Sequence, residues 1–147
     1  MRLRPALPED ASAIARTEEV AAHHPWTREQ VAASLALPTT RGWVAEAGVV
    51  RAHLLVSSQG AEGEVLILAV HPSCRRRGWA RQLLRAACEA WTELGVEEAF
   101  LEIRADNQAA LRLYAELGWE TAGTRTSYYH DGTDAVVMRW QAIPGGR

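Results

Sequence analysis

Segments with a helical spacing of apolar residues, every three or four positions, alternate along the chain with short apolar or alternating runs typical of strands. These two patterns predict its secondary structure. Apolar residues at steps of three and four between Ala80 and Leu94, with charged residues on the other side, predict an amphipathic helix from Gly78 to Gly95. Short apolar or alternating runs bounded by glycine or proline predict strands. The expected strands are 2–5, 41–47, 49–57, 65–70, 99–104, 119–126 and 134–140, and the other expected helices are 8–23, 27–37 and 107–117.

The order of these elements predicts a mixed sheet. Tight turns at Gly48 and at 59–61 join three antiparallel strands into a meander. A helix separates strands 65–70 and 99–104, which implies a right-handed crossover between parallel neighbours at the sheet centre. We therefore expect an α/β (α+β) fold with a mixed, mostly antiparallel seven-stranded sheet and helices on both faces. Residues 1–143 should form one domain and 144–147 a flexible tail.

Composition narrows the class of protein. The 147 residues are 48% hydrophobic and carry a net charge of −2, without the overall basic field of a nucleic-acid-binding protein. Cys74 and Cys88 lack CxxC spacing, and the five histidines lack metal-ligand spacing, so we expect no metal. No apolar run is long enough to span a bilayer. The expectation is a cytoplasmic protein, a monomer or weak dimer, without membrane or nucleic-acid partners.

A basic loop follows the strand that His71-Pro72 ends. Residues 75–80 (RRRGWA) lie at the start of the long helix, where free backbone N–H groups and the helix dipole favour an anion. Three adjacent arginines are also typical of a plain solvated loop. The spacing Arg75-x-x-Gly78-x-Ala80 is neither a Walker loop nor a Rossmann fingerprint. It resembles the acetyl-CoA pyrophosphate loop of the GNAT acetyltransferases.

The resemblance to GNAT enzymes covers nearly the whole chain. The element order is that of the GNAT fold, with the basic loop after its fourth strand. Within GNAT, several strings are similar to the RimI branch, which acetylates the N-terminal alanine of a ribosomal protein. These strings are 25–27 (PWT), 68–72 (LAVHP), 101–107 (LEIRADN), 113–119 (LYAELGW) and 128–129 (YY).

The resemblance implies acetyl-CoA as co-substrate, without a metal. The strand edge at 68–70 would hold its pantetheine arm, and the basic loop would hold its pyrophosphate through backbone N–H groups. Bulky Trp79 is unusual there and is expected to cover the fold's edge or the adenine. Asn107 is expected to cap its helix or to bond the cofactor. The implied cofactor residues are Leu68, Ala69, Val70, Arg75, Arg76, Arg77, Gly78, Trp79, Ala80, Arg81 and Asn107.

Acetyl transfer needs a neutral amine, whereas an α-amino group has a pKa of about 8, so a base must take a proton. The resemblance implies Glu102 as this base and Tyr114 as the acid that protonates the departing thiolate. From pattern alone, Glu102 could equally face solvent or pair with Arg104, and Tyr114 could simply pack in the core.

The resemblance also implies a peptide or protein N-terminus as acceptor, for example that of a ribosomal protein. Trp26, Tyr128 and Tyr129 would hold it. Alternatively, Trp26 is a hydrophobic plug between two helices, and the tyrosines pack across strands.

Two other functions fit the same sequence. One is a GNAT enzyme that acetylates a small-molecule amine or a lysine side chain. The other is a non-catalytic sensor that binds acetyl-CoA. The presence of both Glu102 and Tyr114 favours an enzyme.

Overall fold

A seven-stranded sheet forms the centre of the protein, in the order β1-β2-β3-β4-β5-β7-β6. The computed structural model describes residues 1–143, so the expected tail at 144–147 lies outside the described residues. All pairs are antiparallel except β4–β5, which confirms the predicted mixed sheet. The strands are β1 (Arg2–Pro5), β2 (Thr40–Ala47), β3 (Val49–Gln59), β4 (Glu62–Val70), β5 (Glu98–Arg104), β6 (Glu120–Arg125) and β7 (Ala135–Gln141).

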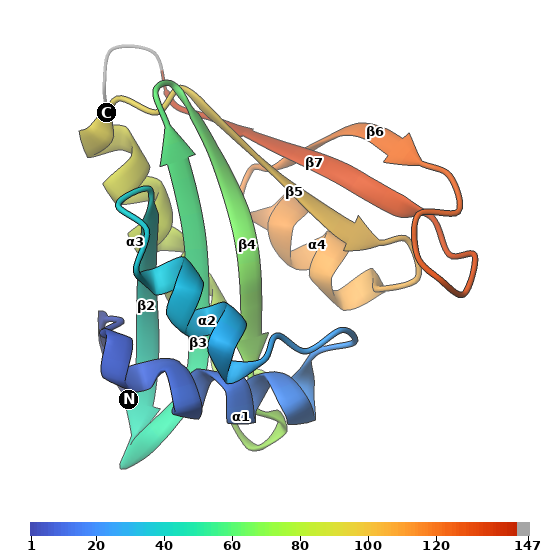
Figure 1. The fold of residues 1–147 in the computed structure, drawn as a ribbon. Coiled ribbons are helices and arrows are strands. Elements are labelled where there is room, and N and C mark those ends of the chain that lie inside the picture. The colour runs from blue at the N-terminus through green and yellow to red at the C-terminus, as the bar shows by residue number, and fades with distance from the viewer. Residues whose placement is uncertain (144–147) are drawn as a thin grey trace.

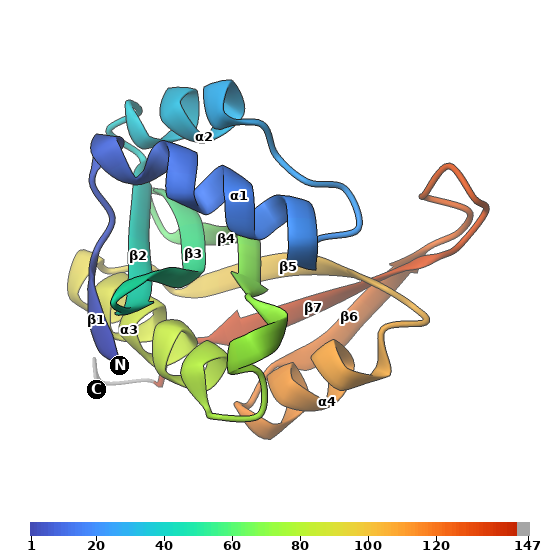
Figure 2. The ribbon, with the colours of Figure 1, turned by 90° about the horizontal axis from the view of Figure 1, so that it is seen from below.

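Helices cover both faces of the sheet, as predicted: α1 and α2 lie on one face, and α3 and α4 on the other (Figure 2). Thr27 caps α2 in a capping box with Gln30. No helix within residues 1–143 combines the length and apolarity needed to cross a membrane. The helices are η1 (Pro8–Asp10), α1 (Ala11–Ala21), α2 (Arg28–Leu35), η2 (Pro72–Cys74), α3 (Trp79–Leu94) and α4 (Gln108–Glu116).

The parallel neighbours β4 and β5 separate soon after they meet. Their pairing covers three residue pairs, ending at Glu64 opposite Phe100. The β3–β4 register shifts between Leu55 and Val56, which leaves Leu66 of β4 as the extra residue of a bulge. A bulge bends its strand and increases the local twist. The two strands therefore diverge as a V in the middle of the sheet (Figure 1).

Two hydrophobic clusters hold the layers together. The larger one packs α3 and α4 against the sheet and includes Leu83, Leu84 and Trp91, all nearly inaccessible to solvent. The smaller one packs Ile14 of α1 and Val31 of α2 against the opposite face. The larger cluster uses Leu83, Leu84, Ala87 and Trp91 of the apolar stripe predicted for α3, whereas Leu94 at the end of that stripe is exposed.

Gly63 marks the tightest contact between α3 and β4. A Cβ atom at this position would lie 2.7 Å from Cε2 and Nε1 of Trp91. Only glycine permits so close an approach of a strand backbone to an aromatic ring. This contact lies at the end of the sheet where β4 and β5 are still paired, and it fixes α3 beside the point from which they diverge.

Candidate active site

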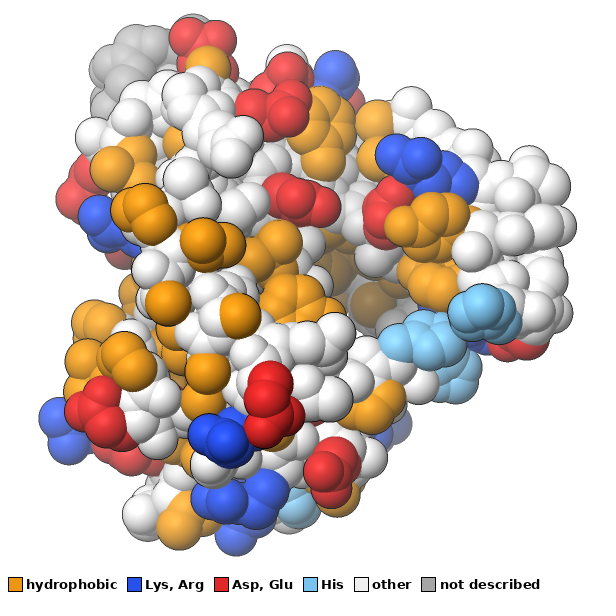
Figure 3. Space-filling view, viewed as in Figure 1, with side chains coloured by type: hydrophobic (Ala, Val, Ile, Leu, Met, Phe, Trp, Pro, Cys, Tyr) orange, Lys and Arg blue, Asp and Glu red, His pale blue; other side chains and the backbone are white. Residues whose placement is uncertain are grey.

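The divergence of β4 and β5 opens a slot with a free strand edge. Residues 68–70 pair with β3 on one side, whereas β5 pairs with β4 only at 62–64. The edge of 68–70 that faces the slot therefore has backbone groups available for a ligand. A cavity of about 250 Å³ occupies the slot, with walls from β4, β5 and α4. In the space-filling view the molecule is hollowed here, with histidine side chains beside the hollow (Figure 3).

A backbone cradle for an anion lies next to β4. Arg76 and Gly78 both have left-handed backbone conformations, with φ of 64° and 78°. Alternation of this kind turns successive N–H groups toward one point. Helix α3 starts at Trp79 without a side-chain cap, so its first N–H groups remain available. Slot and cradle together present a free strand edge next to an anion site.

Three residues expected at the cofactor have other contacts. The Trp79 side chain is buried in the core, 5% exposed, so it does not cover the edge of the fold or an adenine. Arg81 forms an ion pair with Glu116 of α4 at 2.7 Å. Asn107 lines the slot, and its Oδ1 accepts the Ala110 N–H as the cap of α4.

Glu102 lies on β5 at the slot. Its carboxylate forms an ion pair with Arg125 of β6. A hydrogen bond to Glu102 is the largest of the effects that raise the pKa of the Tyr128 hydroxyl. The alternative pairing with Arg104 is absent, because that arginine bonds Asp106 and Asp131 instead.

Glu64 is a second carboxylate near Glu102, next to the slot but not in its lining, and it was not among the residues expected from the sequence. It lies opposite Phe100, two residues before Glu102, and directly paired strand residues point to the same face. Burial, and then the charges of Glu102 and Glu62, raise the pKa of Glu64. The expected strand begins at Val65, one residue after Glu64, and the register that places Glu64 opposite Phe100 is known only from the structure.

Tyr114 of α4 reaches the slot from the other wall. It is 5% exposed and packs edge-on against Trp119, with ring centroids 5.4 Å apart. Burial, with a smaller effect of Cys88, raises the pKa of its hydroxyl. The hydroxyl therefore keeps its proton well above neutral pH. Tyr114 lines the same cavity as Glu102.

An aromatic bridge crosses the slot between two distant loops. His24, in the α1–α2 loop, stacks on Tyr129 of the β6–β7 loop with ring centroids 5.8 Å apart and an angle of 11°. The Arg104 guanidinium lies 5.0 Å from the Tyr129 ring centroid. Trp26, expected at this rim, instead packs against the smaller core cluster. His23 and His24 line the slot in its place.

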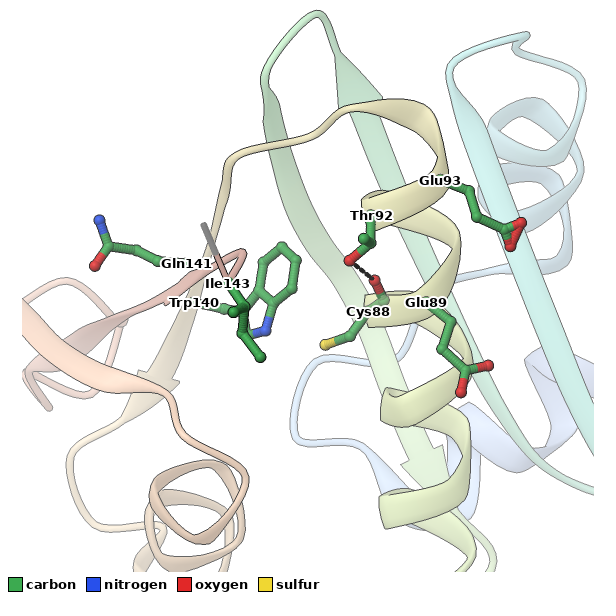
Figure 4. Close-up of a pocket in the computed structure, with 7 residues that line it drawn as sticks. All are labelled: Cys88, Glu89, Thr92, Glu93, Trp140, Gln141 and Ile143. Atoms are coloured by element: carbon green, nitrogen blue, oxygen red, sulfur yellow. Dashed lines mark hydrogen bonds between the residues drawn. The ribbon is translucent and has the colours of Figure 1, made fainter. Parts of the chain in front are cut away.

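Another hollow, of about 430 Å³, lies between α3 and the end of β7 (Figure 4). Its walls include Cys88, Trp140 and Ile143. Burial raises the pKa of the Cys88 thiol to about 12, so this thiol is not a nucleophile near neutral pH. The hollow lacks the free strand edge and the anion cradle, and we therefore place the candidate active site at the β4–β5 slot.

Comparison with known proteins agrees with this architecture. Residues 9–119 match the acetyltransferase (GNAT) family. The [ribosomal protein bS18]-alanine N-acetyltransferase of Escherichia coli K12 is 30% identical over 132 residues, 88% of this chain and 89% of that protein. An N-alpha-acetyltransferase of Sulfurisphaera tokodaii is 38% identical over 78 residues, 52% of this chain and 47% of that relative, so the match spans about half the length of this relative.

Structural similarity extends over the whole described fold. The crystal structure of the ribosomal-protein-S18-alanine N-acetyltransferase from Escherichia coli superposes with a TM-score of 0.88 and 27% identity, and the match covers 98% of this chain and 97% of that chain. The splayed strands, the cradle at α3 and the extent of these matches agree: the chain is an acyltransferase and belongs to the GNAT family.

Proposed function

We propose that this enzyme transfers the acetyl group of acetyl-CoA to the α-amino group of a protein N-terminus. One observation carries the proposal: Glu102 and Tyr114 line the same slot from opposite walls, beside a free strand edge that fits a pantetheine arm. The N–H groups at 76–80 would hold the pyrophosphate, and acetyl-CoA would supply the activated acetyl carbonyl.

The chemistry needs proton transfers at the nitrogen and at the sulfur. The Glu102 carboxylate takes one proton from the ammonium form of the incoming amine, and the neutral nitrogen then bonds the thioester carbonyl carbon, whose oxygen takes up the negative charge. The nitrogen gives its second proton to water, and the carbonyl re-forms and expels the sulfur. As the carbon–sulfur bond breaks, the Tyr114 hydroxyl gives its proton to the sulfur. Its raised pKa supports this role, since the hydroxyl is protonated at neutral pH. Both residues return to their starting states by proton exchange with water.

The aromatic bridge formed by His24 and Tyr129 is one reason to propose a peptide N-terminus as the acceptor. The stacked rings of His24 and Tyr129 narrow the entrance to the slot, and the Arg104 guanidinium packs against the Tyr129 ring. A peptide N-terminus can pass such a constriction with one extended strand. A mid-chain lysine would need two strands to fit around its side chain. A small amine also fits, and it is the second candidate acceptor.

The name of the Escherichia coli relative specifies the alanine terminus of ribosomal protein bS18 as its acceptor. We extend this to the present chain as a proposal: peptides that begin with alanine are the preferred acceptors. The likeness over nearly the full length of both chains supports it.

The test is thiol release from acetyl-CoA with a panel of acceptors. Peptides that begin with Ala or Ser should react, whereas internal-lysine peptides with blocked N-termini and polyamines should be poor acceptors. Mass spectrometry locates the added acetyl group on the peptide. Acetylation of lysine side chains of the enzyme itself cannot contribute to thiol release, because its sequence contains no lysine. Rapid turnover of polyamines alone would refute the proposed acceptor, and thiol release with none of them would favour a sensor.

A matched pair of variants tests the base. Glu102→Gln should lower kcat by about 100-fold or more, which is typical of a lost general base, without changing acetyl-CoA affinity. Glu120→Gln, at an exposed glutamate on the edge strand β6, should retain the wild-type rate. Equal rates for the two variants would refute the role of Glu102.

A further inference from the structure

A buried ionisable pair lies beneath the α1–α2 loop. Oε2 of Glu18 on α1 and Nε2 of His53 on β3 are 2.7 Å apart, and their side chains are 2% and 0% exposed. Removal of such groups from water is costly, and an apolar pair of similar size is often as stable. The proposed chemistry does not use this pair. The burial of this pair therefore indicates a role other than proton transfer to or from the substrates.

The same carboxylate also holds the loop. Oε1 of Glu18 accepts the backbone N–H of Trp26 at 3.1 Å. Trp26 lies in the segment 22–27 between the end of α1 and the start of α2. Glu18 thus joins three parts of the molecule, namely α1, the loop and strand β3.

His53 lies on β3, the strand that pairs with the slot-forming part of β4. It pairs in register with Ala69 of β4, one of the residues whose free edge forms the slot. Its Nδ1 has no hydrogen-bond partner within residues 1–143. Among residues 1–143, Glu18 is therefore the only polar contact of the imidazole, and this contact orients the carboxylate toward Trp26.

The loop that Glu18 fastens carries the bridge over the slot. His24, two residues before Trp26, stacks on Tyr129. Cofactor contacts lie elsewhere, on β4 and at the start of α3. Displacement of the loop would therefore change the acceptor side of the site and leave the cofactor side unchanged.

We propose that Glu18, oriented by His53, is a positioning residue that sets the affinity for the acceptor by holding the 22–27 loop across the slot. This inference rests on the proposed function for its acceptor. It assigns a role to a pair that touches neither substrate.

Three variants test it. In Glu18→Gln the amide oxygen can still accept the Trp26 N–H, and the amide nitrogen can donate to His53, so the acceptor KM should stay within about twofold of wild type. In Glu18→Leu/His53→Leu an apolar pair replaces the ionisable one, and Trp26 loses its acceptor. The acceptor KM should rise by about fivefold to tenfold, the equivalent of one lost hydrogen bond, with the acetyl-CoA Kd unchanged.

Ile14→Ala is the control for general destabilisation. Ile14 is fully buried on the same helix and belongs to the smaller core cluster against which Trp26 packs, but its side chain has no acceptor for the Trp26 N–H, which bonds Glu18. It should lower the melting temperature yet leave the acceptor KM unchanged. An equal rise in KM for Ile14→Ala at a comparable loss of stability would overturn the proposal.

Hydrogen exchange at the Trp26 amide gives a readout independent of activity. The amide should exchange slowly in the wild type and in Glu18→Gln, and at least about tenfold faster in the double variant. This result stands even if no peptide is acetylated, so failure of the proposed function is recognised separately. Unchanged exchange in the double variant would overturn the proposal, as would an unchanged acceptor KM.

Discussion

The Glu102 carboxylate on β5 is held by Arg125 on β6, the edge strand beyond β7. The Arg125 guanidinium also lies 5.7 Å from the ring centroid of Tyr128, and Glu102 is the main cause of the raised pKa of the Tyr128 hydroxyl. Two residues of the closing hairpin thus orient the proposed base. A reacting group positioned in this way loses less entropy at the transition state.

The pKa of Glu64 should depend on the charge of Glu102. Burial and the nearby charge of Glu102 raise the pKa of Glu64, so Glu64 keeps its proton to higher pH than a free glutamate. Glu102→Gln removes the like charge, and the pKa of Glu64 should therefore fall. Carbon-13 NMR titration of the glutamate carboxyls measures the change. Glu120→Gln should not move this pKa, and an unmoved pKa in Glu102→Gln would show that the two groups are uncoupled.

Tyr114→Phe separates chemistry from packing. Phenylalanine keeps the edge-on contact with Trp119 and removes only the hydroxyl. We expect kcat to fall by about 100-fold, as for a lost general acid, and the melting temperature to change little. Thiol-release kinetics and thermal unfolding measure the two effects. A wild-type kcat would assign Tyr114 to the core alone.

The anion cradle should depend on backbone conformation more than on arginine charge. Gly78 has φ of 78°, and no atom lies within 4 Å of the position that a Cβ would take, so Gly78→Ala introduces backbone strain without a clash. This strain is about 1–2 kcal/mol, and the affinity for acetyl-CoA should fall by about tenfold. Arg76→Gly relieves a strained φ of 64° and removes one charge. Its affinity should fall less, and the loss should vanish at high salt, as measured by calorimetry.

If Arg76→Gly instead weakened binding more than Gly78→Ala at every salt concentration, the side chain would be the main contact. The exposure of all three loop arginines makes the salt dependence a direct test of that alternative.

Asp10 should make stability depend on acidity. Arg4 bonds both of its carboxylate oxygens at 2.9 Å, and the Leu7 N–H bonds one of them at 2.7 Å. The Arg4 bonds are the largest of the effects that lower the pKa of Asp10. The folded state therefore binds fewer protons than the unfolded state, and this stabilisation is present above the unfolded-state pKa of about 4 and lost as the pH falls through the lower, folded-state value.

Asp10→Asn should accordingly lower the free energy of unfolding by about 1.5–3 kcal/mol at pH 7, the range for hydrogen bonds to charged groups. The difference from wild type should shrink in acid. Urea unfolding at several pH values measures it. Glu29→Gln, in an exposed ion pair with Arg28, should cost less than about 1 kcal/mol. A pH-independent difference for Asp10→Asn would contradict the assigned cause.

Periodic segments were predictable because their signals are local. The apolar stripe of α3, the glycines at its two ends and the short runs of β3, β4 and β5 each lie within one segment. Those signals were enough to predict the order of elements and the parallel β4–β5 crossover. Asn107 was also recognised as a cap from its place before α4.

Side-chain partners were less predictable because they depend on how elements meet. Trp26 follows a proline between two helices, and packing against the smaller core cluster rather than the slot decided its position. Arg81 was expected at the cofactor, but α4 brings Glu116 within 2.7 Å of it. Neither partner is near in sequence.

By itself, the sequence determined the order of helices and strands, the three-stranded meander, the parallel crossover and the residue types available for acetyl transfer, because hydrophobic period and turn chemistry act over a few residues. Only the tertiary structure decided which groups surround Glu102. The divergence of β4 from β5 opens the slot, and the closing hairpin brings Arg125 and Tyr128 to the carboxylate. Strand register and helix packing set these distances, and both depend on contacts between residues far apart in the chain.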